Sequence, residues 1–162
     1  MSDAAKFDAC HHHRAPKLSR KALATAIAQA KDRSYRRGVR WTALRQRALE
    51  LLLEAGGPVK AYDLVPLLKA GASAAPPTIY RALDTLVDLG VAHRIASLNA
   101  YTACHVGRED HSASFLICDC CGGVEEMASP TDEIGSAIKA QSQFRTVSIM
   151  VEAHGTCGRC QT

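Results

Sequence analysis

The sequence predicts an α+β protein with an N-terminal winged helix-turn-helix domain and a C-terminal α/β domain that contains a four-cysteine zinc site. Three observations lead to this prediction. Helical periodicity in the first part gives way to a short hairpin, two C-x2-C pairs frame a β-α-β segment, and the two parts carry opposite net charge. With 162 residues and 47% hydrophobic composition, the chain can bury a core in one domain or two.

The first part reads as helices followed by a hairpin. Leu23 and Ile27 recur at helical spacing after Ser19, a residue suited to cap a helix N-terminus. Thr42 can cap a second helix, which Gly56 ends. The predicted helices span 18–37, 43–55, 61–70 and 76–90, and strands 91–96 and 100–104 flank a turn at 97–99. The last three of these four helices, followed by the hairpin, give the order of a winged helix-turn-helix.

The second part has the pattern of a β-α-β unit. A short apolar strand at 115–117 leads into Cys118, and the glycines at 122–123 turn the chain back. A strand at 124–127, a helix at 131–140 that begins in the 129–132 cluster, and a strand at 146–153 follow before Cys157. The unit therefore lies between two cysteine pairs.

The charge differs between the two parts. Residues 1–100 carry 16 Lys/Arg and 8 Asp/Glu, whereas residues 101–162 carry 4 and 8. A basic first part indicates contact with a polyanion, most plausibly nucleic acid, although a solvated basic surface is an equal alternative on charge alone. No secretory segment and no bilayer-length apolar run is present, so we expect a cytoplasmic protein in a reducing environment.

Four of the seven cysteines have the spacing of a structural zinc site. In a reducing compartment, cysteines at short spacing more often bind metal than each other. Two C-x2-C turns supply four thiolates for tetrahedral zinc and leave no position open for substrate water. The predicted structural ligands are Cys118, Cys121, Cys157 and Cys160. Cys120 lies inside the first pair and is predicted to be a surplus thiol.

A second candidate metal set surrounds the hairpin: His93, Cys104, His111 and Glu126. Two imidazoles, one thiolate and one carboxylate suit tetrahedral zinc. Residue types alone favour the alternative that the histidines are ordinary surface residues and Glu126 a solvated charge. His105, His154 and the segment Cys10–His13 are further candidates, of which the last reads as an incidental binder on a mobile tail.

The fourth predicted helix has side chains suited to the DNA major groove. Thr78, Tyr80 and Arg81 offer donors and an aromatic edge to base pairs. Flanking cations, among them Arg45, Lys60 and Arg94, could bind phosphates, with a solvated surface charge as the alternative for each.

These motifs resemble the ferric uptake regulator family of metal-responsive bacterial repressors, from about Thr42 to Cys160. The similarity is carried by the segments 45–47, 61–64, 77–83, 111–121 and 152–155. Within the family the chain is most similar to the zinc uptake regulators. It lacks the His-rich stretch that iron-sensing members place before the first cysteine pair, and it lacks a histidine in the strand at 146–151.

The resemblance implies a homodimer that binds a palindromic operator when metal is present. It implies a DNA-binding domain at 17–96, a hinge at 97–101 and a dimerisation domain at 102–162, after a mobile tail at 1–16 that the lack of apolar periodicity there predicts. It matches the four cysteines to the structural zinc site, and His93, Cys104, His111 and Glu126 to the zinc sensor, which reverses the interpretation from residue types. Tyr62, Tyr80 and Arg81 match DNA contacts.

The predicted function is a zinc-responsive repressor with two zinc ions per protomer that controls zinc uptake genes. An iron- or peroxide-responsive regulator of the same family is the alternative. A zinc enzyme is a poorer reading, because neither H-E-x-x-H nor the deaminase pattern of H-x-E with P-C-x-x-C occurs. A zinc-stapled interaction module without DNA binding is the remaining class.

Overall fold

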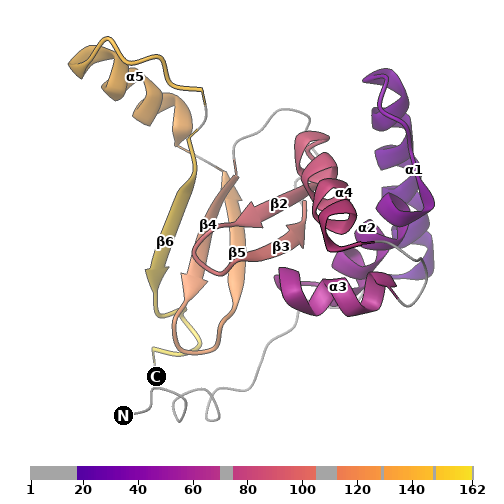
Figure 1. Ribbon diagram of the computed structural model, residues 1–162. Helices are drawn as coiled ribbons and strands as arrows, with labels where there is room; N and C mark the ends of the chain where they lie inside the picture. Colours follow the sequence, from indigo (N-terminus) through magenta and orange to yellow (C-terminus); the bar gives the residue numbers. More distant parts are fainter. Residues whose placement is uncertain (1–17, 70–74, 105–112, 129, 148, 162) are drawn as a thin grey trace. The chain divides into compact units, whose positions relative to one another are not determined.

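A computed structural model of the chain describes residues 18–69, 75–104, 113–128, 130–147 and 149–161. These residues form two compact units, one that ends with Cys104 and one that begins with Ala113 (Figure 1). The predicted tail at 1–16 and the predicted ligand His111 lie outside the described residues. Each unit is built around its own three-stranded sheet.

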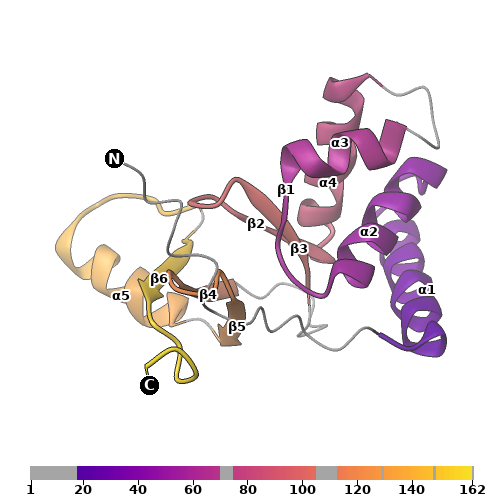
Figure 2. The same ribbon diagram turned by 90° about the horizontal axis from the view of Figure 1, so that it is seen from below.

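The described part of the N-terminal unit contains four helices, all of which the sequence predicted. They are α1 (Arg20–Arg36), α2 (Ala43–Ala55), α3 (Ala61–Lys69) and α4 (Pro76–Asp88). Figures 1 and 2 both show α1 and α2 side by side. Local chemistry sets the bounds: the Ser19 hydroxyl accepts the Ala22 N–H at 3.2 Å, and two prolines open α4.

The start and end of α2 illustrate this local control. Thr42 is extended, with φ −125° and ψ 157°, and its hydroxyl accepts the Arg45 N–H at 3.3 Å. Gly56 ends the helix at φ 61°, a left-handed conformation that glycine adopts without steric cost. Both signals are visible in the sequence, and both predictions are confirmed.

We expect Thr42→Ala to lower the free energy of unfolding of the N-terminal unit by about 0.5–2 kcal/mol, because the Arg45 N–H loses its cap. Denaturant unfolding followed by the fluorescence of the single tryptophan, Trp41, measures this change. Thr25→Ala is the control: the Thr25 hydroxyl bonds within α1 to the Lys21 C=O, where alanine is the better helix former. Equal losses in both variants would contradict the capping role.

Apolar side chains from α2, α3, α4 and the sheet form the core of this unit. The largest apolar side chains that are fully buried in this unit are Leu49, Leu52, Leu64, Leu68, Ile79, Leu83, Leu86, Leu89, Ile95 and Tyr101. In α2, Leu49 and Leu53 are buried, while Leu44 and Leu51 are only half-buried.

The sheet of the N-terminal unit has the order β1-β3-β2 and is antiparallel. Its strands are β1 (Val59–Lys60), β2 (Ala92–Ile95) and β3 (Ala100–Ala103). The sequence predicted the hairpin of β2 and β3 but not the two-residue strand β1, which pairs with Tyr101 and Ala100. Helices followed by this hairpin make a winged helix-turn-helix.

The residues of the predicted hinge, 97–101, belong to this hairpin. Residues 97–99 form the turn of the hairpin, where Asn99 has φ 47°, and Ala100 and Tyr101 are buried in β3. The strand β3 is hydrogen-bonded on both sides, and the described residues up to Cys104 belong to the N-terminal unit. The domain bounds and the hinge stay predictions.

The C-terminal unit has the sheet order β5-β4-β6 (Figure 1). Its elements are β4 (Ala113–Cys118), β5 (Val124–Ala128), α5 (Thr131–Gln141) and β6 (Val151–Gly155). The central strand β4 pairs antiparallel with β5 and parallel with β6. The predicted last strand at 146–153 was wrong at both ends, because the pairing with β4 begins at Val151 and runs on to Gly155.

Among the described residues, no helix is both long enough and apolar enough to span a bilayer.

Candidate metal centre and nucleic-acid interface

Two strand ends bring the cysteine pairs together. In the parallel pairing of β4 and β6, Cys118 lies opposite Gly155, and Cys157 follows two residues later. Carboxyl ends of parallel strands meet at one edge of a sheet, so the turns after both strands are neighbours. Backbone bonds fix the turns: the Asp119 N–H donates to the Gly155 C=O, and the Cys160 N–H to the Cys157 C=O, each at 2.8 Å.

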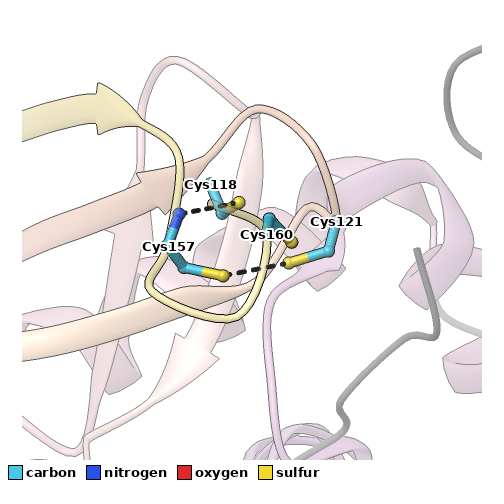
Figure 3. Close-up of side chains that lie close together, drawn as sticks. All are labelled: Cys118, Cys121, Cys157 and Cys160. Carbon is cyan, nitrogen blue, oxygen red and sulfur yellow. Dashed lines mark hydrogen bonds between the residues drawn. The ribbon is translucent and has the colours of Figure 1, made fainter. Parts of the chain in front are cut away.

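The four predicted structural ligands converge in this place (Figure 3). The Sγ atoms of Cys118, Cys121, Cys157 and Cys160 all lie within 4.8 Å of one another. The Sγ atoms of Cys121 and Cys157 are 3.9 Å apart. Tetrahedral zinc with bonds of about 2.3 Å requires sulfur atoms about 3.8 Å apart, so the donor set fits the ion in number, type and spacing.

Hydrogen bonds at this edge shift the pKa values of two of the thiols in opposite directions. Backbone N–H groups, first that of Cys157 at 3.3 Å and then that of Cys121, lower the pKa of Cys118 to about 6. Hydrogen bonding with Cys157, followed by burial, raises the pKa of Cys160 to about 12. Four adjacent thiolates repel one another, and a divalent cation removes that obstacle by binding all four.

Two residues beside the cysteine cluster, His154 and Asp119, connect the strand β6 to the turn after β4. The sequence did not predict this contact. His154 Nδ1 and Asp119 Oδ1 lie 2.9 Å apart, with both side chains substantially exposed. This pair links β6 to the turn after β4. His154 had been considered only as a possible ligand, and no signal in the sequence relates it to Asp119, 35 positions earlier. Cys120 is half-buried, lies outside the four clustered cysteines and is disulfide-bonded, so the prediction of a surplus thiol was wrong.

Part of the second predicted metal set meets in the N-terminal unit. Ligand atoms of His93 on β2 and Cys104, just after β3, lie within 4.8 Å of each other. The Cys104 N–H donates to the Val91 C=O at 3.0 Å, which fixes the cysteine beside the start of β2. Glu126 is half-buried on β5 of the C-terminal unit, opposite Phe115. An imidazole nitrogen beside a thiol sulfur is a donor pair suited to zinc.

The predicted recognition helix α4 presents its polar side chains to solvent. Thr78 and Arg81 are exposed and Tyr80 is 38% exposed, while Ile79, Leu83 and Leu86 are buried. Pro76 and Pro77 have no backbone N–H groups to offer at the start of the helix. The predicted contacts of this helix with DNA must therefore come mainly from its side chains.

The helix α4 is tied to the hairpin by a buried phenol. The Tyr101 hydroxyl donates to the Asp84 carboxylate at 3.3 Å. Burial, followed by the negative charge of Asp84, raises the pKa of Tyr101. This bond fixes β3 against the face of α4 that carries Asp84.

Three of the other predicted DNA contacts are available on the surface. Tyr62 on α3 is 62% exposed, and the Lys60 Nζ lies 5.9 Å from the centre of its ring. Arg94 is exposed on β2.

The guanidinium group of Arg45 is hydrogen-bonded within the protein. Its guanidinium donates to the Arg40 C=O and, at 3.1 Å, to the Thr85 hydroxyl on α4. The side chain is half-buried and bridges α2 and α4. We therefore assign Arg45 a role in fixing α4 beside its predicted role at phosphates.

The fold and the cysteine cluster define a winged helix-turn-helix protein with a C-terminal α/β unit whose thiols are arranged for a metal ion. A model of the ferric uptake regulator family matches residues 36–154. The chain belongs to this family.

Relatives and solved structures agree with this assignment. The chain is 39% identical over 137 residues to the zinc uptake regulation protein of Escherichia coli (strain K12), a match that spans 83% of this chain and 80% of that protein. A structure of a zinc uptake regulator complexed with zinc and DNA superposes with TM-score 0.78 at 37% identity, covering 85% of this chain and 94% of the other. Holo XcZur gives TM-score 0.75 at 37% identity over 86% and 98%.

Proposed function

We propose that this protein is a zinc-responsive transcriptional repressor that binds palindromic operator DNA as a homodimer and controls zinc uptake genes. The observation that carries the proposal is the adjacency of His93 and Cys104, a donor pair suited to zinc, within the unit that holds the exposed helix α4. The likeness to a zinc uptake regulator complexed with zinc and DNA supports it. A DNA partner implies action in the cytoplasm.

Two zinc ions per protomer have separate tasks in this proposal. Cys118, Cys121, Cys157 and Cys160 hold a structural ion, and His93, Cys104, His111 and Glu126 hold a regulatory one. Zinc binding to the regulatory set shifts the population towards the conformation that binds the operator, through its higher affinity for that conformation. Four protein ligands saturate each ion, which is consistent with a regulator and leaves no position for catalysis.

Operator contact is assigned to the exposed side chains of the N-terminal unit. Thr78, Tyr80 and Arg81 on α4 read base edges in the major groove. Tyr62, Lys60, Arg94 and Arg45 contact the backbone and fix the register. The positive charge of this part of the chain favours the encounter with DNA.

A second copy of the chain is the proposed partner of the C-terminal unit. None of the described side chains of α5 is buried. The exposed fractions of Phe144, Val147 and Met150 are 71%, 93% and 56%, and Leu116 and Met127 are 41% exposed. Apolar side chains gathered in one unit at such exposure indicate an association surface, and a palindromic site requires a twofold assembly.

The test selects duplexes from a random pool with zinc-loaded protein and then measures their binding by fluorescence anisotropy, with and without zinc. We expect tight binding only with zinc, and an affinity that falls steeply as salt rises. Metal analysis should give two zinc ions per protomer, one of them lost on mild chelation together with DNA binding. Binding that responds to iron(II) or peroxide instead would favour the alternative regulator, and no duplex binding would favour an interaction module.

A further inference from the structure

The C-terminal end of the recognition helix α4 is bound by two arginines from the end of α1. Arg33 Nη1 donates to the carbonyls of Leu89, at 3.1 Å, and Gly90, at 2.9 Å. Arg37 Nη1 donates to the Asp88 carbonyl at 2.8 Å. The last carbonyls of a helix have no partner within it and carry partial negative charge. The two guanidinium groups therefore cap α4 from a different helix.

This cap supplies charge that α4 itself lacks. The last turn of α4, which is described in full, contains no basic residue and ends at the acidic Asp88. Arg33 is only 7% exposed, and a buried guanidinium destabilises a fold unless hydrogen bonds replace its hydration. The carbonyls of Leu89 and Gly90 provide such bonds.

The backbone at Gly90 is shaped for this contact. Gly90 has φ +66°, a left-handed conformation that side chains disfavour, and a Cβ there would lie 3.3 Å from Arg33 Nη1. Glycine therefore permits both the turn out of α4 and the close approach of the guanidinium.

The segment held by the arginines leads directly to the candidate zinc ligands. Val91 donates its N–H to the Leu86 C=O at 3.1 Å and accepts the Cys104 N–H at 3.0 Å. His93 follows two positions later on β2. Arg33, Gly90, Val91 and Cys104 also line one small cavity of about 50 Å³. Residues 88–91 thus lie between the arginines and Cys104.

We propose that Arg33 and Arg37 are positioning residues that couple the His93–Cys104 ligand pair to the recognition helix. They fix the end of α4 and the start of β2 as one body, so that a change in the position of the ligands moves the helix as well. Without the two arginines, the turn at Gly90 can change its conformation, so that a movement of the ligands no longer moves α4. This inference rests on the function proposed above.

The test compares Arg33→Met with Lys31→Met, which removes the same charge from an exposed position of α1. In Arg33→Met we expect the zinc affinity of DNA-free protein to change by less than about twofold, while the factor by which zinc raises operator affinity falls about tenfold. In Lys31→Met, zinc should raise operator affinity by the same factor as in the unaltered protein, because the charge of Lys31 contributes only nonspecific attraction of DNA. Arg33→Lys, which keeps the charge and fewer donors, should give an intermediate factor.

Hydrogen exchange without DNA gives a second readout. The amides of Gly90 and Val91 bond to the carbonyls of Val87 and Leu86. Zinc should slow their exchange and that of α4 in the unaltered protein, but should slow only β2 and β3 in Arg33→Met. A purely structural role would speed exchange equally with and without zinc, so the zinc-dependent difference isolates the coupling.

The proposal would be overturned if zinc raised the operator affinity of Arg33→Met by the same factor as in the unaltered protein and still protected α4 from exchange to the same extent. This holds even if that variant were less stable. If Arg33→Met does not fold, Arg37→Gln, which leaves the buried arginine in place, is measured in the same way, and an unchanged factor there overturns it. If the unaltered protein shows no zinc dependence at all, the proposed function fails and the coupling fails with it.

Discussion

Replacing Cys104 by serine should abolish zinc-dependent operator binding and leave a folded dimer with one zinc per protomer. A thiolate is the ligand of highest affinity for zinc in the proposed regulatory set, and a serine hydroxyl does not deprotonate to replace it at neutral pH. Since zinc acts only through its preference for one geometry, loss of the ion should lower operator affinity about 10²-fold. The cluster of Cys118, Cys121, Cys157 and Cys160 lies in the other unit and should keep its metal.

The measurement combines anisotropy titration, zinc content and sedimentation for Cys104→Ser and a matched variant. Cys120 lies outside both proposed ligand sets and is disulfide-bonded in the structure, so both variants are measured under reducing conditions. There Cys120→Ser makes the same substitution and should bind the operator with unchanged zinc dependence. The assignment of the sensor would be wrong if Cys104→Ser still responded to zinc, or if it lost both ions at once.

Replacing Cys157 by serine should have a larger effect, namely the loss of structure in the whole C-terminal unit. The buried apolar residues of this unit among the described positions are few: Ala113, Phe115, Ile117 and Cys118. A core of this size supplies little stability on its own, whereas a structural zinc ion contributes about 10 kcal/mol or more to a small metal-bound fold. Removing one of four thiolates also leaves three clustered thiols without their cation.

Hydrogen exchange and sedimentation of Cys157→Ser test this expectation. Protection should disappear from β4 to β6 and the dimer should dissociate, while α2 and α4 stay protected by their own core. Prolonged strong chelation of the unaltered protein should reproduce the result. A Cys157→Ser dimer that keeps full protection of β4 would show that packing alone, without the ion, holds the unit together.

Part of the fold follows from the sequence because its causes are local. Ser19 and Thr42 accept N–H groups three positions along, and Gly56 ends α2 through its own φ angle. Each C-x2-C pair forms a turn from four consecutive residues. These signals act within one helical turn or one loop, so a single sequence is enough to predict them.

Other features depend on partners that lie far apart in the chain. Nothing near Val59 indicates that it pairs with Tyr101, and a turn at 97–99 has the same sequence pattern whether or not the following strand is hydrogen-bonded on both sides. Likewise Arg45 reads as an exposed cation, yet it donates to Thr85, 40 positions later.

The sequence by itself determined the helices, the hairpin and the identity of the four clustered cysteines, because capping, periodicity and ligand spacing are properties of short segments. Only the tertiary structure decided that β4 and β6 run parallel and so bring both cysteine pairs to one edge. It also decided that Arg33 serves the end of α4 and not the solvent. A buried charge is stable only beside its partners, and those partners are 56 and 57 positions away.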